Sequence, residues 1–194
     1  MREVASEEFR PVGAYAAYDV CTMNISLREV ETLDDDTLRA LSSLLVRVVA
    51  TGAAVSFLHP LDDGEARAYW AALPRPGIRV VIATSGDVIV GTVQVHLAAQ
   101  ANGQHRADVA KMMVDPNWQR RGIGRQLLAR AEAIALAHGR TTLVLDTEED
   151  APSNHLYAGA GWMVVGRIAD YARSSSGGLH ATIIYAKWLA RPEG

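Results

Sequence analysis

The sequence predicts an α/β fold of the α+β type, in which helices and mostly antiparallel strands form one domain. Of the 194 residues, 49% are apolar, which suits a single hydrophobic core. Two β-branched runs lie on either side of Gly86-Asp87, as in a hairpin with a tight turn. Apolar residues then recur at helical spacing from about residue 121 to a glycine at 139. The order of such segments along the chain defines the expected fold.

The first part of the chain is expected to contain a tail, a strand and two helices. Residues 1–12 predict a flexible tail, residues 13–194 a single domain, and residues 15–30 contain the first strand. Aspartates at 34–36 suit the start of a helix that ends at Thr51-Gly52. Its apolar residues share one face: Leu38, Leu41, Leu44, Leu45 and Val48. A second helix is expected over residues 63–73, where prolines at 74 and 76 stop it.

Strands predominate in the rest of the chain, around one long helix. The hairpin at Gly86-Asp87 is followed by a turn at Asn102-Gly103 and by a strand, "RADVAKMMV", that Pro116 ends. One face of the long helix is apolar: Ile123, Leu127, Ala131, Ile134 and Ala135. The run "TTLVLDTEED" predicts another strand, and Ser153 is expected to cap a short helix. Two final strands are expected at about 162–170 and 181–188.

Composition excludes several classes of function. The net charge is -3 and no basic cluster is present, so we expect no nucleic-acid partner. The lone Cys21 forms no intrachain disulfide, and the six histidines lack metal-ligand spacing, which predicts no metal. No signal peptide and no apolar run of about 18 residues is visible. We therefore expect a cytoplasmic protein that does not contact the membrane.

The stretch "QRRGIG", residues 119–124, lies where a strand gives way to the long helix. Main-chain N–H groups at a helix N-terminus point the same way and attract anions. Gly122 and Gly124 lack Cβ atoms and would let a phosphate approach the main chain. The stretch completes neither the dinucleotide fingerprint nor the P-loop. Taken alone, it is better explained as a glycine turn beside solvated arginines.

Taken with its surroundings, this stretch resembles the GCN5-related N-acetyltransferase (GNAT) family, whose members are acyltransferases. The resembling segments are "NGQHRADVAKMMV", "RRGIGRQLLARAEAIALAHGR", "LVLDTEED" and "LYAGAGWMVVGRIADY". The resemblance implies a GNAT fold, with a mixed sheet splayed between the fourth and fifth strands and about four flanking helices. It also implies acetyl-CoA as donor, bound by Met112, Met113, Val114, Gln119, Arg120, Arg121, Gly122, Ile123, Gly124, Arg125 and Asn154.

Two residues are expected to act on the reacting groups. In many members of the family, a tyrosine at the position of Tyr157 protonates the departing thiolate, and a phenol with a pKa near 10 is protonated at neutral pH. The alternation in "TTLVLD" puts Asp146 at the carboxyl end of its strand, opposite in face to Leu143 and Leu145. We prefer Asp146 to its acidic and histidine neighbours as the general base or the anchor of a cationic amine.

The acceptor is expected to be a small molecule with an amine, such as an antibiotic or toxin. Residues 55–62 and 172–180 are expected to wall its site, with contributions from Phe57, Leu58, His59 and Lys111. Lys111 is expected to pair with Asp146 or Asp108. Two alternatives remain: another acceptor (a protein N-terminus, a polyamine or an amino-acid metabolite) or a non-catalytic CoA-binding sensor. An exposed last strand is expected to allow a homodimer.

Overall fold

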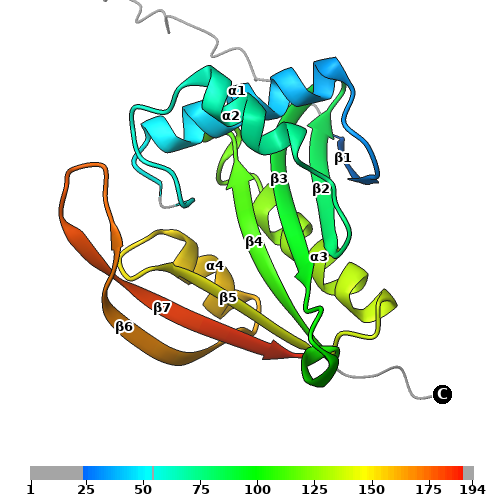
Figure 1. The fold of residues 1–194 in the computed structure, drawn as a ribbon, viewed down its shortest axis with the longest axis vertical. Coiled ribbons are helices and arrows are strands. Elements are labelled where there is room, and N and C mark those ends of the chain that lie inside the picture. The colour runs from blue at the N-terminus through cyan, green and yellow to red at the C-terminus, as the bar shows by residue number, and fades with distance from the viewer. Residues whose placement is uncertain (1–23, 54, 190–194) are drawn as a thin grey trace, which may run out of the picture.

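The computed structural model describes residues 24–53 and 55–189, which form one seven-stranded sheet with helices on both faces (Figure 1). The predicted tail at 1–12 and Cys21 lie outside the described residues. The strand order is β1-β2-β3-β4-β5-β7-β6. Only β4 and β5 pair in parallel, and the other neighbours are antiparallel. The expected mixed, mostly antiparallel sheet is confirmed.

The helices and strands follow the predicted order, with small changes at their ends. They are β1 (Ile25–Val30), α1 (Asp35–Ala50), α2 (Asp63–Ala71), β2 (Ile78–Ser85), β3 (Val88–Leu97), β4 (Arg106–Val114), α3 (Ile123–Ala137), β5 (Thr142–Glu148), α4 (Ser153–Gly159), β6 (Met163–Arg173) and β7 (Leu179–Trp188). Short 3-10 turns occupy Ala101–Gly103 and Pro116–Trp118. Ser153 is not a cap, because α4 has Pro152 at its N-cap and the Ser153 hydroxyl bonds to that of Thr147.

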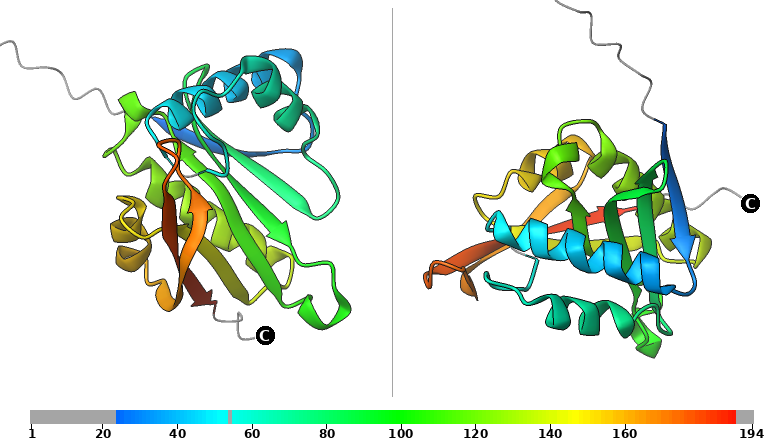
Figure 2. Two further views of the ribbon diagram at one scale, coloured as in Figure 1. Left: turned by 60° about the vertical axis from the view of Figure 1, so that its left-hand side comes forward. Right: turned by 90° about the horizontal axis from the view of Figure 1, so that it is seen from above.

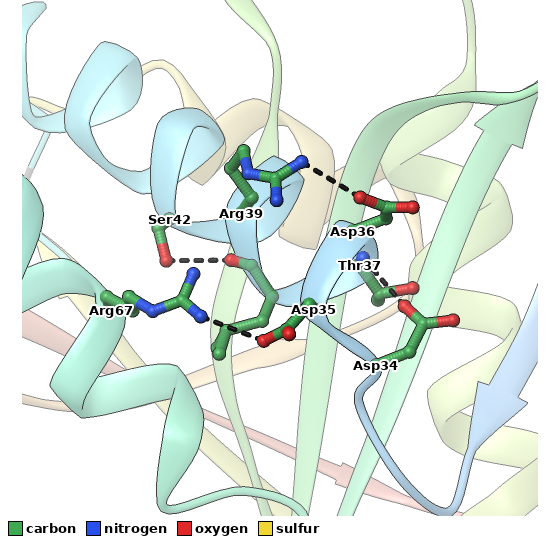
Figure 3. A network of polar contacts seen from close by, with 8 residues as sticks. Asp34, Asp35, Asp36, Thr37, Arg39, Ser42 and Arg67 are labelled. Atoms are coloured by element: carbon green, nitrogen blue, oxygen red, sulfur yellow. Dashed lines mark hydrogen bonds and ion pairs between the residues drawn. The ribbon is translucent and has the colours of Figure 1, made fainter.

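The acidic start of α1 works as the sequence predicts (Figure 3). The Asp34 carboxylate accepts a hydrogen bond from the Thr37 main-chain N–H at 2.8 Å, which satisfies a donor that the helix itself leaves unpaired. The Asp35 carboxylate forms an ion pair with Arg67 of α2, at 2.9 Å between Oδ1 and Nη2. The first turn of α1 is therefore capped locally and tied to the second helix.

Each face of the sheet carries its own hydrophobic core (Figure 2). Helices α1 and α2 cover one face, where Leu41, Leu44 and Trp70 are fully buried. Helix α3 covers the other face with the apolar stripe expected from the sequence, and Leu127 and Ala131 are fully buried there. Burying such side chains supplies the main stabilisation of the fold. No helix in the described part of the chain is long and apolar enough to span a bilayer.

Strands β4 and β5 separate soon after they begin to pair (Figure 1). Only Arg106–Asp108 of β4 pair with Thr142–Val144 of β5. Further along β4 the register with β3 shifts between Thr92 and Gln94, and Lys111 takes a positive φ of 50°. Beyond Asp108 and Val144 the two strands are unpaired, and this divergence is the opening between β4 and β5. The predicted splay is confirmed.

The last strand does not form the exposed edge that the sequence analysis expected. Strand β7 lies between β5 and β6, so β6 is the edge of the sheet on this side. The register gives the reason, because the β6–β7 hairpin folds back and β7 pairs with β5 over the whole of β5. Large apolar side chains of β6 are exposed, including Val164, Val165 and Tyr171. A homodimer remains a prediction, and it would use β6.

Glu132 of α3 joins the helix to the far end of the sheet, and its removal is expected to destabilise the protein. Its carboxylate accepts hydrogen bonds from Lys187 Nζ, at 2.7 Å to each oxygen, and from the Trp162 indole N–H at 3.0 Å. Glu132→Ala leaves the mostly buried Lys187 ammonium without its carboxylate partner. We therefore expect the free energy of unfolding to fall by about 2 kcal/mol, or Tm to fall by roughly 5 °C. Thermal unfolding of the variant and of the parent protein measures this change in Tm. Arg39→Ala, which removes an exposed ion pair with Asp36, is the control and should leave Tm unchanged.

Candidate functional site

Tyr157 of α4 is buried beside the opening between β4 and β5. Only 6% of it is exposed, and its ring packs against Tyr185 at 5.5 Å between centroids and against Trp162 at 6.3 Å. Burial raises the pKa of the Tyr157 phenol, and the negative charge of Asp146 and the nearby Tyr185 raise it further. The phenol therefore keeps its proton throughout the neutral range, as a proton donor must.

Asp146 of β5 lies on the opposite face of its strand from Leu143 and Leu145, as the alternation predicts. The two leucines are buried, whereas Asp146 is exposed. Thr182 of β7 holds the carboxylate: its hydroxyl donates to Asp146 Oδ2 at 3.3 Å and to the Thr147 carbonyl at 2.8 Å. The Asp146 charge acts on both Tyr157 and Lys111. A carboxylate in this position is able to bind an amine or take a proton from it.

Asn154 has a structural task in this protein that the sequence did not reveal. Its side-chain N–H groups donate to the carbonyls of Glu148, Glu149 and Ala151 at 2.8–2.9 Å. Its Oδ1 accepts from the Tyr185 hydroxyl at 2.9 Å. Asn154 thus ties the loop after β5 to α4 and orients Tyr185, which packs against Tyr157. Its predicted contact with acetyl-CoA stays a prediction.

The stretch at residues 119–125 forms the turn into α3. Gly122 has a φ of 77° and no side-chain cap, and the first helical bond runs from Gln126 N–H to Gly122 O at 3.1 Å. The N–H groups of Ile123, Gly124 and Arg125 precede this bond, which leaves them without partners inside the helix. A Cβ on Gly122 would meet no atom within 4 Å, so this side of the turn is open. The main chain here suits a phosphate group.

Several long side chains around this turn bond to the protein main chain. Gln119 Nε2 donates to the Val114 carbonyl at 3.4 Å, and Arg125 donates to the Gly159 carbonyl at 2.6 Å. Arg121 donates to the Asn117 carbonyl at 3.2 Å, and its guanidinium lies 5.1 Å from the Trp118 ring centroid. Arg120 adopts a positive φ of 61°. Main-chain groups are therefore the better placed donors to an anion, and the arginines supply positive charge.

The segment Met112, Met113 and Val114 lies on β4 beyond its last pair with β5. Met113 is 2% exposed and belongs to the core under α1 and α2, whereas Met112 and Val114 pack on the opposite face. On its other edge β4 pairs with β3 through Met113 and Val114. The edge that faces β5 is available to an extended ligand, which would lie like an added strand.

Lys111 does not form the predicted ion pair. Its Nζ donates to the Val55 carbonyl at 2.8 Å and lies 5.4 Å from the centroid of the Phe57 ring. In the described part of the chain no carboxylate lies within 4.0 Å of this ammonium. The bulge in β4 turns Lys111 toward the loop between α1 and α2, and this long-range contact has no local signal in the sequence.

A cavity of about 170 Å³ lies between the α1–α2 loop and the β6–β7 hairpin. Its lining includes the predicted Phe57, Leu58 and Asp146, but not His59 or Lys111. The His59 main-chain N–H instead donates to Ser175 Oγ at 2.8 Å and joins the two walls. The other lining residues are Gly52, Ala53, Ser56, Thr147, Glu148, Tyr171, Ala172, Arg173, Ser174, Ser175, His180, Ala181 and Thr182.

Thr182 of β7 lines this cavity although the sequence analysis gave it no role, and His180 lies at the end of the wall expected over residues 172–180. His180 Nδ1 lies 2.7 Å from Glu148 Oε1, and the pair separates the cavity from a second one lined by Glu149, Asp150 and Arg167. The only signal in the sequence was the position of His180 just before a predicted strand. Its partner lies on another strand, and only the pairing of β5 with β7 brings the two together.

Gly124 faces α4 closely, which leads to a testable prediction. A Cβ on this residue would lie 3.1 Å from Leu156 Cδ2, next to Tyr157 in the chain. We expect Gly124→Ala to push α4 outward, to destabilise the protein by about 1 kcal/mol and to lower acetyl transfer. Thermal unfolding and a thiol-release assay measure the two effects. Gly166→Ala places its Cβ in open space and should change neither.

Comparison with known proteins agrees with this geometry. Residues 49–162 match the model of the acetyltransferase (GNAT) family. Among solved structures, yncA of Salmonella typhimurium, described with its cofactor acetyl-CoA, has a TM-score of 0.71 at 19% identity, covering 88% of this chain and 96% of that one. The ribosomal-protein-S18-alanine N-acetyltransferase of Escherichia coli has a TM-score of 0.65 at 19% identity, covering 88% and 97%.

A structure described as a candidate phosphinothricin N-acetyltransferase is also similar, with a TM-score of 0.73 at 16% identity and coverage of 86% and 99%. At these identities the structures establish the fold, and the family model establishes the family. The match of residues 49–162 to this family makes the protein an acyltransferase. The chain belongs to the GNAT acetyltransferase family and is an N-acetyltransferase.

Proposed function

We propose that this enzyme transfers the acetyl group of acetyl-CoA to the amine of a small molecule. The observation that carries the proposal is the cavity beside Asp146. Its volume of about 170 Å³ lies below the roughly 300 to 1,000 Å³ of typical small-molecule pockets. Two walls enclose it, joined by the bond from His59 to Ser175. A site of this size suits a small amine-bearing group better than an extended chain.

In the proposed reaction acetyl-CoA lies between β4 and β5, with its pyrophosphate at the turn into α3. Gly122, Ile123 and Gly124 would hold the phosphates through main-chain N–H groups, and Met112–Val114 would hold the pantetheine arm. Asp146 takes a proton from the acceptor amine or anchors it. Tyr157 donates its proton to the sulfur as the thioester breaks. Asn154 and Thr182 keep the helix and the carboxylate in place.

An antibiotic or toxin as acceptor is the narrower part of the proposal. It is supported by resemblance to the tabtoxin resistance protein, a β-lactam-precursor acetyltransferase, in segments such as "LVLDTEED" and "GGLHATIIYAKWL". The similar solved structures do not select an acceptor. One is described with a small-molecule acceptor and another with a ribosomal protein.

Two alternatives make different predictions. A protein N-terminus needs an open groove, which disagrees with the walls formed by Phe57 and the hairpin residue Arg173. A CoA-binding sensor needs neither an acid nor a base, which disagrees with Tyr157 and Asp146 around one opening. A polyamine or an amino-acid metabolite remains compatible with the cavity beside Asp146.

The test is a thiol-release assay with acetyl-CoA and a panel of amines: β-lactam-like amino acids, aminoglycosides, polyamines and a peptide. We expect turnover with at least one small amine and none with the peptide. Acetyl-CoA is also expected to raise Tm, because it binds the folded state. Turnover of the peptide alone would contradict the small-molecule acceptor, and absence of any thermal shift would contradict donor binding.

A further inference from the structure

Lys111 places an amine of this chain next to the opening between β4 and β5. The residue sits in the β4 bulge with a φ of 50°, beyond the last pair between β4 and β5. Its Nζ donates to the Val55 carbonyl at 2.8 Å and lies over Phe57. Phe57 lines the same cavity as Asp146. The ammonium therefore lies at the border of the predicted acceptor site.

Three chemical groups needed for acetyl transfer converge here. The charge of Asp146 acts on the Lys111 amine and on the Tyr157 phenol, so the carboxylate lies within electrostatic range of both. An amine, a group able to take its proton and a group able to protonate a thiolate surround one opening. The proposed reaction requires the same three groups, with the acceptor amine in place of Lys111.

The surroundings of Lys111 also favour its reactive form. Burial lowers the pKa of the ammonium, and the negative charge of Asp146 opposes this shift only in part. The Val55 carbonyl and the Phe57 ring favour the ammonium, but less strongly than a bonded carboxylate would. A larger fraction of Lys111 than of an exposed lysine is therefore a neutral amine with a free electron pair.

We propose that Lys111 is a self-acetylation site: with acetyl-CoA bound and no acceptor present, its Nζ takes the acetyl group. This inference rests on the proposed function. The Nζ electron pair forms a bond to the thioester carbon, and the carbon–sulfur bond breaks. CoA leaves as the thiol with the Tyr157 proton. The amine proton passes to Asp146, and exchange with solvent restores both side chains.

Acetylation would alter the wall of the acceptor cavity. The positive charge over Phe57 disappears, and with it the cation–π attraction. The amide is bulkier than the ammonium beside Val55, and the α1–α2 loop must adjust to it. We therefore expect self-acetylation to lower the rate of acceptor turnover, and a good acceptor to protect Lys111 by competing for the same acetyl group.

Lys187 is the matched control, because Lys111 and Lys187 are the two lysines of the sequence. Lys187 Nζ contacts both Glu132 oxygens at 2.7 Å and the Ala160 carbonyl at 2.8 Å. The Glu132 carboxylate is bonded to this ammonium, whereas no carboxylate in the described part of the chain lies within 4.0 Å of Lys111. Lys187 also lies at the end of β5–β7 where the two strands stay paired.

The test is mass spectrometry of the full-length protein after incubation with acetyl-CoA and no acceptor. We expect the mass of one acetyl group, mapped by peptide analysis to Lys111. Lys111→Arg should abolish the gain, Lys187→Arg should keep it, and Asp146→Asn should slow it about 100-fold or more, within the usual range for a general base. Heat-unfolded protein should show no preference between the two lysines.

A second measurement separates this inference from the proposed function. If acetyl-CoA raises Tm and an acceptor is acetylated while Lys111 stays unmodified, the self-acetylation proposal is wrong and the enzyme function stands. Equal modification of Lys111 and Lys187 in the folded protein would also overturn the proposal, because it would reflect solution reactivity. If acetyl-CoA does not bind at all, the proposed function fails together with it.

Discussion

Replacing Tyr157 with phenylalanine is expected to lower kcat about 100-fold, the lower end of what a positioned general acid contributes. The ring stays buried against Tyr185 and Trp162, so the fold should not change. Acetyl-CoA affinity should also persist, since the phenol is expected to act on the sulfur only as the bond breaks. Steady-state kinetics and a titration with acetyl-CoA measure the two quantities.

The pH dependence gives a second test of the same residue. Because the pKa of Tyr157 is raised above its usual value near 10, its acid form persists as the pH rises, and kcat should not fall on the alkaline side below about pH 10. Tyr185→Phe is the control, since it removes the bond to Asn154 and the effect of the Tyr185 hydroxyl on the Tyr157 pKa but keeps the Tyr157 phenol. A Tyr157→Phe enzyme as active as the parent would remove Tyr157 from the mechanism.

Replacing Asp146 with asparagine is expected to lower kcat/KM for the acceptor about 100-fold. The side chain is exposed, and asparagine can still accept from Thr182, so stability should change little. If Asp146 is a base, activity should recover partly at high pH, where more of the acceptor amine is neutral. If it is only an anchor, KM should rise and kcat should persist.

Asp150→Asn is the matched control for this substitution. It removes the same charge from a residue that lines the second cavity and not the one beside Asp146. Its kinetics should equal those of the parent enzyme. An Asp146→Asn variant with the parental rate and pH profile would eliminate both roles, and an equal loss in the Asp150→Asn variant would indicate a general effect of charge.

Local patterns predicted most of the fold, including the turn that is proposed to bind the donor. The stripe of α3 and the alternation around Asp146 depend on neighbours in sequence, so periodicity was enough to find them. The turn at Gly122 was also visible, because a glycine with positive φ carries its own signature. The family resemblance added the splay between β4 and β5, which no local pattern contains.

Contacts between distant segments explain what the sequence did not predict. Lys111 was expected to meet a carboxylate, but the β4 bulge turns it toward Val55, a residue 56 positions away. Asn154 was assigned to acetyl-CoA, yet three loop carbonyls and Tyr185 engage its amide. The position of β7 between β5 and β6 likewise depends on strand pairing. Each case required knowledge of which segments meet.

The hydrogen bond from His59 to Ser175 joins two segments that lie 116 positions apart in the chain. These two segments belong to different parts of the enzyme with respect to its family. The family model matches residues 49–162, which contain the turn into α3 and both predicted catalytic residues. The hairpin wall, with Tyr171, Arg173 and His180, follows that region. Under the proposed function, we therefore expect mutations in the hairpin to change the acceptor amine while the residues proposed to act on the thioester stay the same.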